Sequence, residues 1–120
     1  MRFAVCTKQA EERSQLRKWI EHYCALCNLP AGVVCVETPA QLAQFQPGGI
    51  QVAFIGFGGG TGFMAARALR ERDRACRIIL IDDTSEYAIN GLHLHFADFI
   101  LRPVEFRHVV RGIRLAMERF

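Results

Sequence analysis

With 120 residues, of which 51% are hydrophobic and 22% charged, the chain has the size and composition of one globular domain, and intrinsic disorder is excluded. The formal net charge of +3 arises from basic residues interspersed with Glu and Asp, so nucleic-acid binding is not indicated. The longest apolar runs are far shorter than the roughly 20 residues of a membrane-spanning helix, so we expect neither a membrane partner nor a signal peptide.

The first half of the chain alternates between apolar runs and one long amphipathic pattern. Residues 3–6 and the β-branched run 33–36 predict buried strands. Between them a helix is predicted to begin near Ala10, because apolar residues recur at spacings of three and four. Its apolar stripe contains Leu16, Trp19, Ile20, Tyr23, Cys24 and Cys27. The capping box in residues 38–41 then predicts a short helix with proline at its first position.

The second half of the chain contains three more apolar runs. They predict buried strands at residues 52–55, 78–81 and 98–101. A glycine-rich stretch at residues 56–62 is predicted to form a loop that leads into a helix at about residues 63–71, and a shorter helix is predicted at 86–92. A final amphipathic helix is indicated by Phe106, Val109, Val110, Ile113, Met117 and Phe120.

Strands and helices that alternate in this way predict the α/β class. We expect one domain over residues 1–120, with a doubly wound five-stranded parallel sheet between two layers of helices in an α/β/α arrangement. In such a sheet the functional crevice lies at the carboxyl ends of the strands. Candidate functional groups are therefore sought in the loops after Cys6, Ile55, Ile81 and Leu101.

Two stretches of the sequence resemble receiver domains of response regulators, in particular those of the LytTR type. Residues 1–6 are similar to the opening strand of such receivers. Residues 85–91 and 97–104 are similar to the segment that carries the fourth helix, the fifth strand and a Lys-Pro turn. The resemblance covers the whole chain, with a shorter loop after the third strand. It implies a flavodoxin-like receiver fold and a role in bacterial two-component signal transduction or transcription regulation.

Every position that carries the chemistry of a receiver departs from the family's pattern. Thr7 and Lys8 stand in place of the acidic pair that holds Mg²⁺, and Gly56 stands in place of the phosphoacceptor aspartate. Asp82 replaces the hydroxyl residue that ends the fourth strand, and Arg102 replaces the lysine before proline. Because glycine offers no nucleophile and Mg²⁺ prefers carboxylate ligands, we expect a pseudo-receiver without metal, cofactor or enzymatic activity.

The replacements also suggest a compensating ion pair. We expect Lys8 and Arg102 to supply positive charge where the metal would lie, and Asp82 to pair with it. Such a pair would hold Arg102 in place. It would also keep Phe99, which matches the family's switch aromatic, in one of the two receiver conformations.

The resulting hypothesis is a phosphorylation-independent module for dimerisation or protein interaction in the cytoplasm. Receivers of this kind commonly dimerise through the fourth helix, fifth strand and fifth helix, so a homodimer or an effector protein is the expected partner. The charged candidates on this face are Glu86, Arg102, Glu105, Arg107 and Arg111. Relatives usually continue into a DNA-binding domain, whereas this chain stops at Phe120. The sequence leaves open whether it acts alone or is a fragment of a longer regulator.

The glycine-rich stretch supports an alternative function, a small-ligand sensor that binds an anion or a nucleotide. Backbone amides between a strand and a helix form phosphate sites, and two cationic residues are expected at neighbouring strand ends. The candidate anion-binding residues are Lys8, Gly58, Gly59, Gly60, Thr61 and Arg102. As a dinucleotide fingerprint the stretch fails, because Thr61 stands where the third glycine belongs.

The cysteines and the paired histidines are expected to carry no chemistry. Five cysteines, an odd number in a chain without an export signal, indicate free thiols and a reducing compartment. Burial is expected for Cys6, Cys24, Cys27 and Cys35, despite the CxxC spacing of the middle two. Cys76 is expected to be exposed. His93 and His95 lack a third metal ligand and are expected at the surface.

Overall fold

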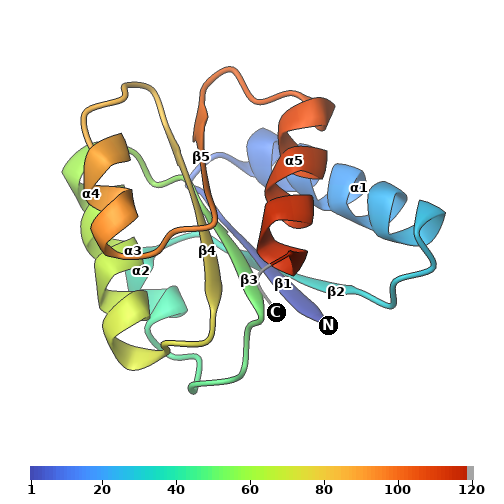
Figure 1. Ribbon diagram of the computed structural model, residues 1–120, viewed down its shortest axis with the longest axis horizontal. Coiled ribbons are helices and arrows are strands. Elements are labelled where there is room, and N and C mark those ends of the chain that lie inside the picture. The colour runs from blue at the N-terminus through green and yellow to red at the C-terminus, as the bar shows by residue number, and fades with distance from the viewer. Residues whose placement is uncertain (119–120) are drawn as a thin grey trace.

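The computed structural model describes residues 1–118, in which five strands alternate with five helices (Figure 1). The strands are β1 (Arg2–Cys6), β2 (Gly32–Val36), β3 (Val52–Ile55), β4 (Arg77–Asp82) and β5 (Asp98–Leu101). The helices are α1 (Ala10–Leu26), α2 (Pro39–Leu42), α3 (Gly59–Arg72), α4 (Ala88–His93) and α5 (Phe106–Met117). Phe120, predicted as the last apolar residue of the final helix, lies outside the described residues.

The strands form one parallel sheet in the order β2-β1-β3-β4-β5. Val5 is paired with Cys35 on one side and with Phe54 on the other, and Phe54 is paired with Ile79. The chain reverses its direction of winding between β1 and β3, so the crevice of the sheet opens at the carboxyl ends of these two strands. The predicted flavodoxin-like, doubly wound fold is confirmed.

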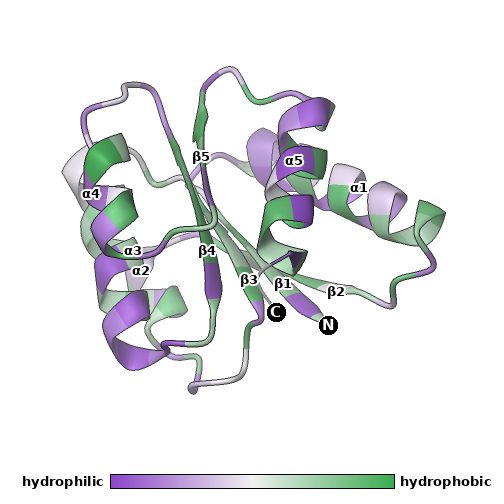
Figure 2. Ribbon diagram, viewed as in Figure 1, coloured by the Kyte–Doolittle hydropathy of each residue, from purple (hydrophilic) through white to green (hydrophobic). Residues whose placement is uncertain are grey.

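Helices cover both faces of the sheet (Figure 1). Phe54 and Ile79 point into the core beneath α1 and α5, whereas their neighbours Ala53 and Ile78 point into the core beneath α2 and α3. Figure 2 shows mostly hydrophobic strands between helices in which hydrophobic and hydrophilic residues alternate. Strands buried on both faces have no polar side to display, which explains their continuous apolar sequences.

The structure differs from the expectations in the placing of three cysteines. Cys35 is exposed, because β2 is the edge strand and not a central one. Cys27 is also exposed, because it lies just after the last residue of α1. Cys76 is buried, since it directly precedes β4, an inner strand of the sheet. The other two cysteines are buried as predicted, and none of the described helices is long and apolar enough to cross a membrane.

Candidate functional site

Four residues of the predicted degenerate site lie together at the carboxyl edge of the sheet. Thr7 follows β1 and Gly56 follows β3. Asp82 ends β4, and Arg102 follows β5. The amide of Gly56 donates to the carbonyl of Cys6 at 2.7 Å, and the amide of Arg102 donates to the carbonyl of Asp82 at 2.9 Å. The register of the sheet therefore fixes the positions of these residues.

The partner of Arg102 is Glu12, a residue of α1. Nε of Arg102 donates to Oε2 of Glu12 at 2.9 Å and Nη2 donates to Oε1 at 2.8 Å, which is the bidentate geometry of a strong ion pair. Oγ1 of Thr7 donates to the same Oε1 at 2.7 Å. The Arg102 and Glu12 side chains are only 21% and 16% exposed, so solvent ions screen this pair weakly.

The guanidinium of Arg102 lies directly against Gly56. Its Nη2 donates to the Gly56 carbonyl at 2.6 Å. A Cβ added at Gly56 would lie 2.8 Å from Nη2 of Arg102 and 3.3 Å from Cβ of Ile81. Arginine thus fills the space that any side chain at position 56 would need. The position predicted to correspond to the phosphoacceptor is therefore closed by the chain's own cation.

The prediction that Asp82 pairs with Arg102 is wrong. Oδ1 of Asp82 accepts hydrogen bonds from the amides of Gly59 at 3.1 Å and Asp83 at 2.7 Å. It is Asp83 that forms the second ion pair of Arg102, at 3.5 Å. Asp82 is 3% exposed, and its Oδ2 has no hydrogen-bond partner. Asp82 binds these amides instead of Arg102 because the free backbone amides at the start of a helix attract a nearby carboxylate.

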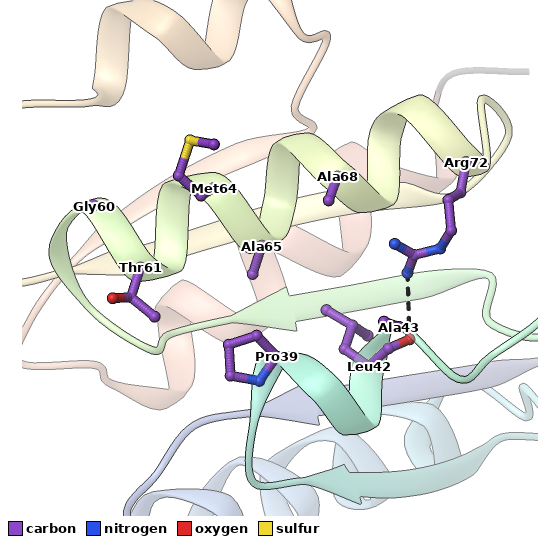
Figure 3. A pocket seen from close by; sticks show the side chains of 9 residues that line it. All are labelled: Pro39, Leu42, Ala43, Gly60, Thr61, Met64, Ala65, Ala68 and Arg72. Atoms are coloured by element: carbon purple, nitrogen blue, oxygen red, sulfur yellow. Dashed lines mark hydrogen bonds between the residues drawn. The ribbon is translucent and has the colours of Figure 1, made fainter.

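The glycine-rich stretch is largely helical and not the predicted loop. Gly58 and Gly59 have φ angles of 92° and 54°, in the left-handed region that glycine enters without strain. They turn the chain so that α3 begins at Gly59 instead of near Phe63. Gly60 and Thr61 lie at one end of a groove of about 530 Å³ between α2 and α3 (Figure 3). They are thus part of a helix surface instead of a phosphate-binding loop.

The residues predicted to bind an anion are therefore not gathered into one open site. Lys8 is exposed and, in the part of the chain that the structure describes, forms no ion pair. Arg102 is already paired with two carboxylates, and the first free amide of α3 already donates to Asp82. The chain's own carboxylates occupy the groups that an anion would need.

The environment of the site stabilises the charged forms of both Glu12 and Arg102. Burial acts to raise the pKa of Glu12, but the hydrogen bonds from Arg102 and Thr7 outweigh it and hold the pKa below its ordinary value. The hydrogen bond to Glu12 raises the pKa of the Arg102 guanidinium, against the effect of burial. Within residues 1–118, no three His, Cys, Asp or Glu side chains are grouped so that they could hold a metal ion. The arrangement can clamp α1 to the end of β5.

The predicted interface charges are mostly neutralised within the chain. Arg107 pairs with Glu105 at 2.9 Å, and Arg111 pairs with Asp98 at 2.8 Å. Glu86 is exposed and precedes α4, which begins at residue 88 and not at 86 as predicted. Pairing of these charges across a two-fold axis stays a prediction, and it would have to compete with the ion pairs that Arg107 and Arg111 form within the chain.

Exposed apolar side chains mark the same face instead, and the sequence analysis missed them. Ile89 and Leu92 of α4 are 72% and 75% exposed, and Leu101 of the edge strand β5 is 49% exposed. Phe99, the predicted switch aromatic, is half-buried against the core beneath α2 and α3. The spacing of Ile89 and Leu92 places both on one side of a short helix, which is the signal that could have found them.

Several solved structures of similar architecture are receiver domains. The non-phosphorylated HemR receiver domain from Leptospira biflexa is similar with a TM-score of 0.79 and 15% identity, over 96% of this chain and 93% of that one. A CheY-like receiver domain protein from Methanospirillum hungatei has a TM-score of 0.79 and 13% identity, over 98% and 93%. The response regulator TrrA from Thermotoga maritima, in complex with Mg²⁺ and BeF, has a TM-score of 0.75 and 12% identity, over 96% and 97%.

These comparisons establish the fold of the chain. It has the flavodoxin-like fold of response-regulator receiver domains. No protein-family model matches the sequence, and a search of the curated proteins found no match. The function must therefore be argued from the site itself.

Proposed function

We propose that this chain is an atypical receiver domain of the LytTR type, in bacterial two-component-type signalling or transcription regulation, that acts without phosphorylation. It serves as a dimerisation or protein-interaction module in the cytoplasm and catalyses no reaction. The observation that carries the proposal is the Arg102 guanidinium, which lies against Gly56 and is paired with Glu12. A fixed ion pair replaces the variable charge of a metal and a phosphoryl group.

Coulomb's law supports the loss of metal binding. A divalent cation about 4 Å from the Arg102 guanidinium would be repelled by about 8 kcal/mol at an effective dielectric constant of about 20. The acidic pair that offsets this repulsion in a working receiver is replaced by Thr7 and Lys8. Binding of Mg²⁺ would thus require Arg102 to leave Glu12, which would leave a largely buried carboxylate without its cation.

The apolar surface exposed at Ile89, Leu92 and Leu101, called the apolar patch below, supports an interaction role. Three large apolar side chains exposed on neighbouring elements are a common mark of a protein interface. Leu101 belongs to β5, the strand at the edge of the sheet, and Ile89 and Leu92 belong to α4, the helix that directly precedes β5 in the chain. A second copy of the chain or an effector protein that covers this patch would bury the apolar surface and leave the ion pairs of α5 at the rim.

Light scattering at several protein concentrations tests the proposal. We expect a dimer whose dissociation constant is the same with buffer alone, with Mg²⁺, and with Mg²⁺ plus beryllofluoride, because no acceptor carboxylate remains at Gly56. A change in assembly on addition of the phosphate mimic would show that the site still responds. A monomer at every concentration would contradict self-association.

Replacement of Leu92 by glutamate should weaken the dimer by about tenfold or more, because a charged group would be placed within an apolar contact. The matched control is Leu26→Glu, since Leu26 is 66% exposed at the end of α1. Sedimentation velocity of both variants measures the effect. If Leu26→Glu weakens the dimer and Leu92→Glu leaves it intact, the interface lies on α1 and the proposed face is wrong.

The alternative function, an anion or nucleotide sensor at the glycine-rich stretch, has less support. Its first amide donates to Asp82, and Arg102 is held by Glu12. Of the two candidate anion-binding cations, Lys8 is exposed without an ion pair among the described residues, whereas Arg102 is paired. We expect that nucleotides do not raise the melting temperature of the wild-type protein. A rise that disappears in Lys8→Ala would favour this alternative.

A further inference from the structure

The free edge of β2 presents backbone groups with which another strand can pair. β2 is the outermost strand of the sheet and, in the described part of the chain, is paired only with β1 (Figure 1). The amide of Gly32 and the carbonyl of Val36 form hydrogen bonds of 2.9 and 3.1 Å with the residues that flank β1, so these groups face the sheet. Because peptide groups alternate in direction along a strand, those of Val33 and Cys35 face away from the sheet.

This edge has none of the features by which proteins usually prevent the addition of a strand. Charged residues, proline and β-bulges commonly protect an edge strand. Residues 32–36 contain no charge and no proline, and their pairing with β1 runs through all five residues without a bulge. Val34 is half-buried and Cys35 is exposed. An open and uncharged edge of this kind is a template for another strand.

Helix α1 places charged side chains beside this edge and runs antiparallel to β2. Nη2 of Arg13 lies 3.9 Å from Oε2 of Glu37, the residue that follows β2. One turn further along α1, Arg17 lies beside Cys35. The pKa of Arg17 is raised by its hydrogen bond to Glu21 and, in addition, by the neighbouring Cys35. The two contacts show that α1 advances along β2 toward the start of that strand.

The same geometry places Glu21 at the level of Val33. Four residues of a helix advance about 6 Å, and two residues of a strand advance about the same distance. Nε of Arg17 donates to Oε2 of Glu21 at 3.2 Å, and both side chains are about half exposed. A cation beside Cys35 and an anion beside Val33 therefore accompany the open edge.

We propose that the edge of β2 pairs with the same edge of a second copy of this chain, antiparallel and about a two-fold axis at Val34. Val33 of each copy then lies opposite Cys35 of the other, and each such pair exchanges both of its N–H···O bonds. A register centred on Cys35 is less favourable, because it needs the amide of Glu37, which already donates to Oε1 of Gln41 at 2.7 Å.

Charge complementarity favours a second copy over a strand of another protein. The two-fold axis keeps the two α1 helices on the same face of the joined sheet and reverses their direction. Arg17 of each copy, at the level of Cys35, therefore faces Glu21 of the other copy, at the level of Val33. Each copy offers a cation where the other offers an anion.

This contact is separate from the apolar patch and does not depend on it, because β2 and β5 are the two opposite edge strands of the sheet. Together the two contacts would join dimers into larger assemblies. The β2 edge buries little apolar surface, so we expect it to associate at higher protein concentrations than the apolar patch. Unfolding measured in dilute protein does not detect it.

Sedimentation velocity of charge-reversal variants in reducing buffer tests the pairing. All variants are made in the Leu92→Glu background, which weakens the contact through the apolar patch. We expect Arg17→Glu and Glu21→Arg each to self-associate about tenfold more weakly than the background protein, because like charges then face each other across the axis. An equimolar mixture of the two variants should associate again, since every acid faces an arginine in the mixed dimer.

The matched control uses Arg67 and Glu71, an exposed pair of the same spacing at 3.7 Å. They belong to α3, which covers the other face of the sheet from α1. Arg67→Glu, Glu71→Arg and their mixture should change the self-association of the background by less than about twofold. If they weaken and restore it as the α1 variants do, the effect is one of general surface charge and the proposal is overturned.

Proline at position 35 tests the backbone hydrogen bonds. Cys35→Pro removes an amide that faces away from β1, and proline is tolerated where the amide of an edge strand faces solvent. It should abolish the self-association, whereas Cys35→Ser, which keeps the amide, should preserve it. Loss of association in Cys35→Ser, or association of Cys35→Pro as strong as that of the background, contradicts strand pairing.

Two further outcomes overturn the proposal without any change to β2. One is a mixture of Arg17→Glu and Glu21→Arg that stays monomeric. The other is a Leu92→Glu protein that is monomeric at every concentration, which would leave the free edge to a strand of another protein.

Discussion

Replacement of Arg102 by alanine is expected to lower the free energy of unfolding by about 3 kcal/mol at neutral pH. The substitution removes the cation from Glu12, whose side chain is only 16% exposed, and leaves that carboxylate largely buried with Thr7 as its remaining side-chain donor. It also removes the donor to the Gly56 carbonyl. Urea denaturation of the two proteins at pH 7 measures the difference.

The effect of Arg102→Ala should depend on pH in a defined direction. Because the pKa of Glu12 is held below its ordinary value in the folded state, the stabilisation by this pair is present above about pH 4.3, the ordinary glutamate pKa. It is lost as the pH falls through the lower pKa of the folded protein. The gap between the wild-type and Arg102→Ala stabilities should therefore narrow from pH 7 to pH 3.

A surface ion pair provides the control for this prediction. Arg17 and Glu21 lie one turn apart on α1 with side chains about half exposed, at 52% and 49%, so Arg17→Ala should leave the free energy of unfolding almost unchanged. If Arg102→Ala is as mild as Arg17→Ala, the clamp between α1 and β5 contributes nothing, and the proposed replacement of metal by an ion pair loses its energetic basis.

Replacement of Gly56 by alanine should destabilise the protein by about 2 kcal/mol, because the new methyl group needs space that Arg102 fills. The added Cβ would lie 2.8 Å from Nη2 of Arg102, and hydrogen bonds to Glu12 and to the Gly56 carbonyl keep that nitrogen in place. Either the arginine leaves Glu12 or the strand end moves. Denaturation midpoints of Gly56→Ala and the wild type measure the loss.

A double-mutant cycle isolates the contact between positions 56 and 102. In the Arg102→Ala background, Gly56→Ala should be nearly neutral, since only the tight 3.3 Å contact with Cβ of Ile81 remains. Gly32→Ala is the control, because a Cβ at Gly32 meets nothing within 4 Å. Equal costs for Gly56→Ala in both backgrounds would mean that Arg102 does not close the acceptor position.

Most of the fold follows from local patterns in the sequence. The uninterrupted apolar runs predict strands that are buried on both faces, and the spacing of apolar residues predicts α1 and α5. Thr38 caps α2, because its Oγ1 accepts a hydrogen bond from the amide of Gln41 at 3.2 Å. The position of Thr38 directly before a proline predicts this cap. These elements could be predicted because their signals depend on near neighbours in the chain.

The site could be located from the sequence, but its contacts could not. The ends of β1, β3, β4 and β5 must meet at one edge of a parallel sheet, which brings Thr7, Gly56, Asp82 and Arg102 together. Glu12 was missed, because its contact with Arg102 spans 90 residues and no local pattern indicates it. Asp82 was assigned the wrong partner, because the start of α3 was placed too late in the chain.

Local patterns in the amino-acid sequence were enough to predict the class of fold and the edge of the sheet where the candidate site lies. The contacts of Glu12 with Arg102 and of Asp82 with the amide of Gly59 became known only from the arrangement of helices and strands in space. The difference arises because the two kinds of information have different ranges along the chain. Periodicity and composition report which face of an element is buried, whereas side-chain pairing depends on how helices and strands are placed in three dimensions.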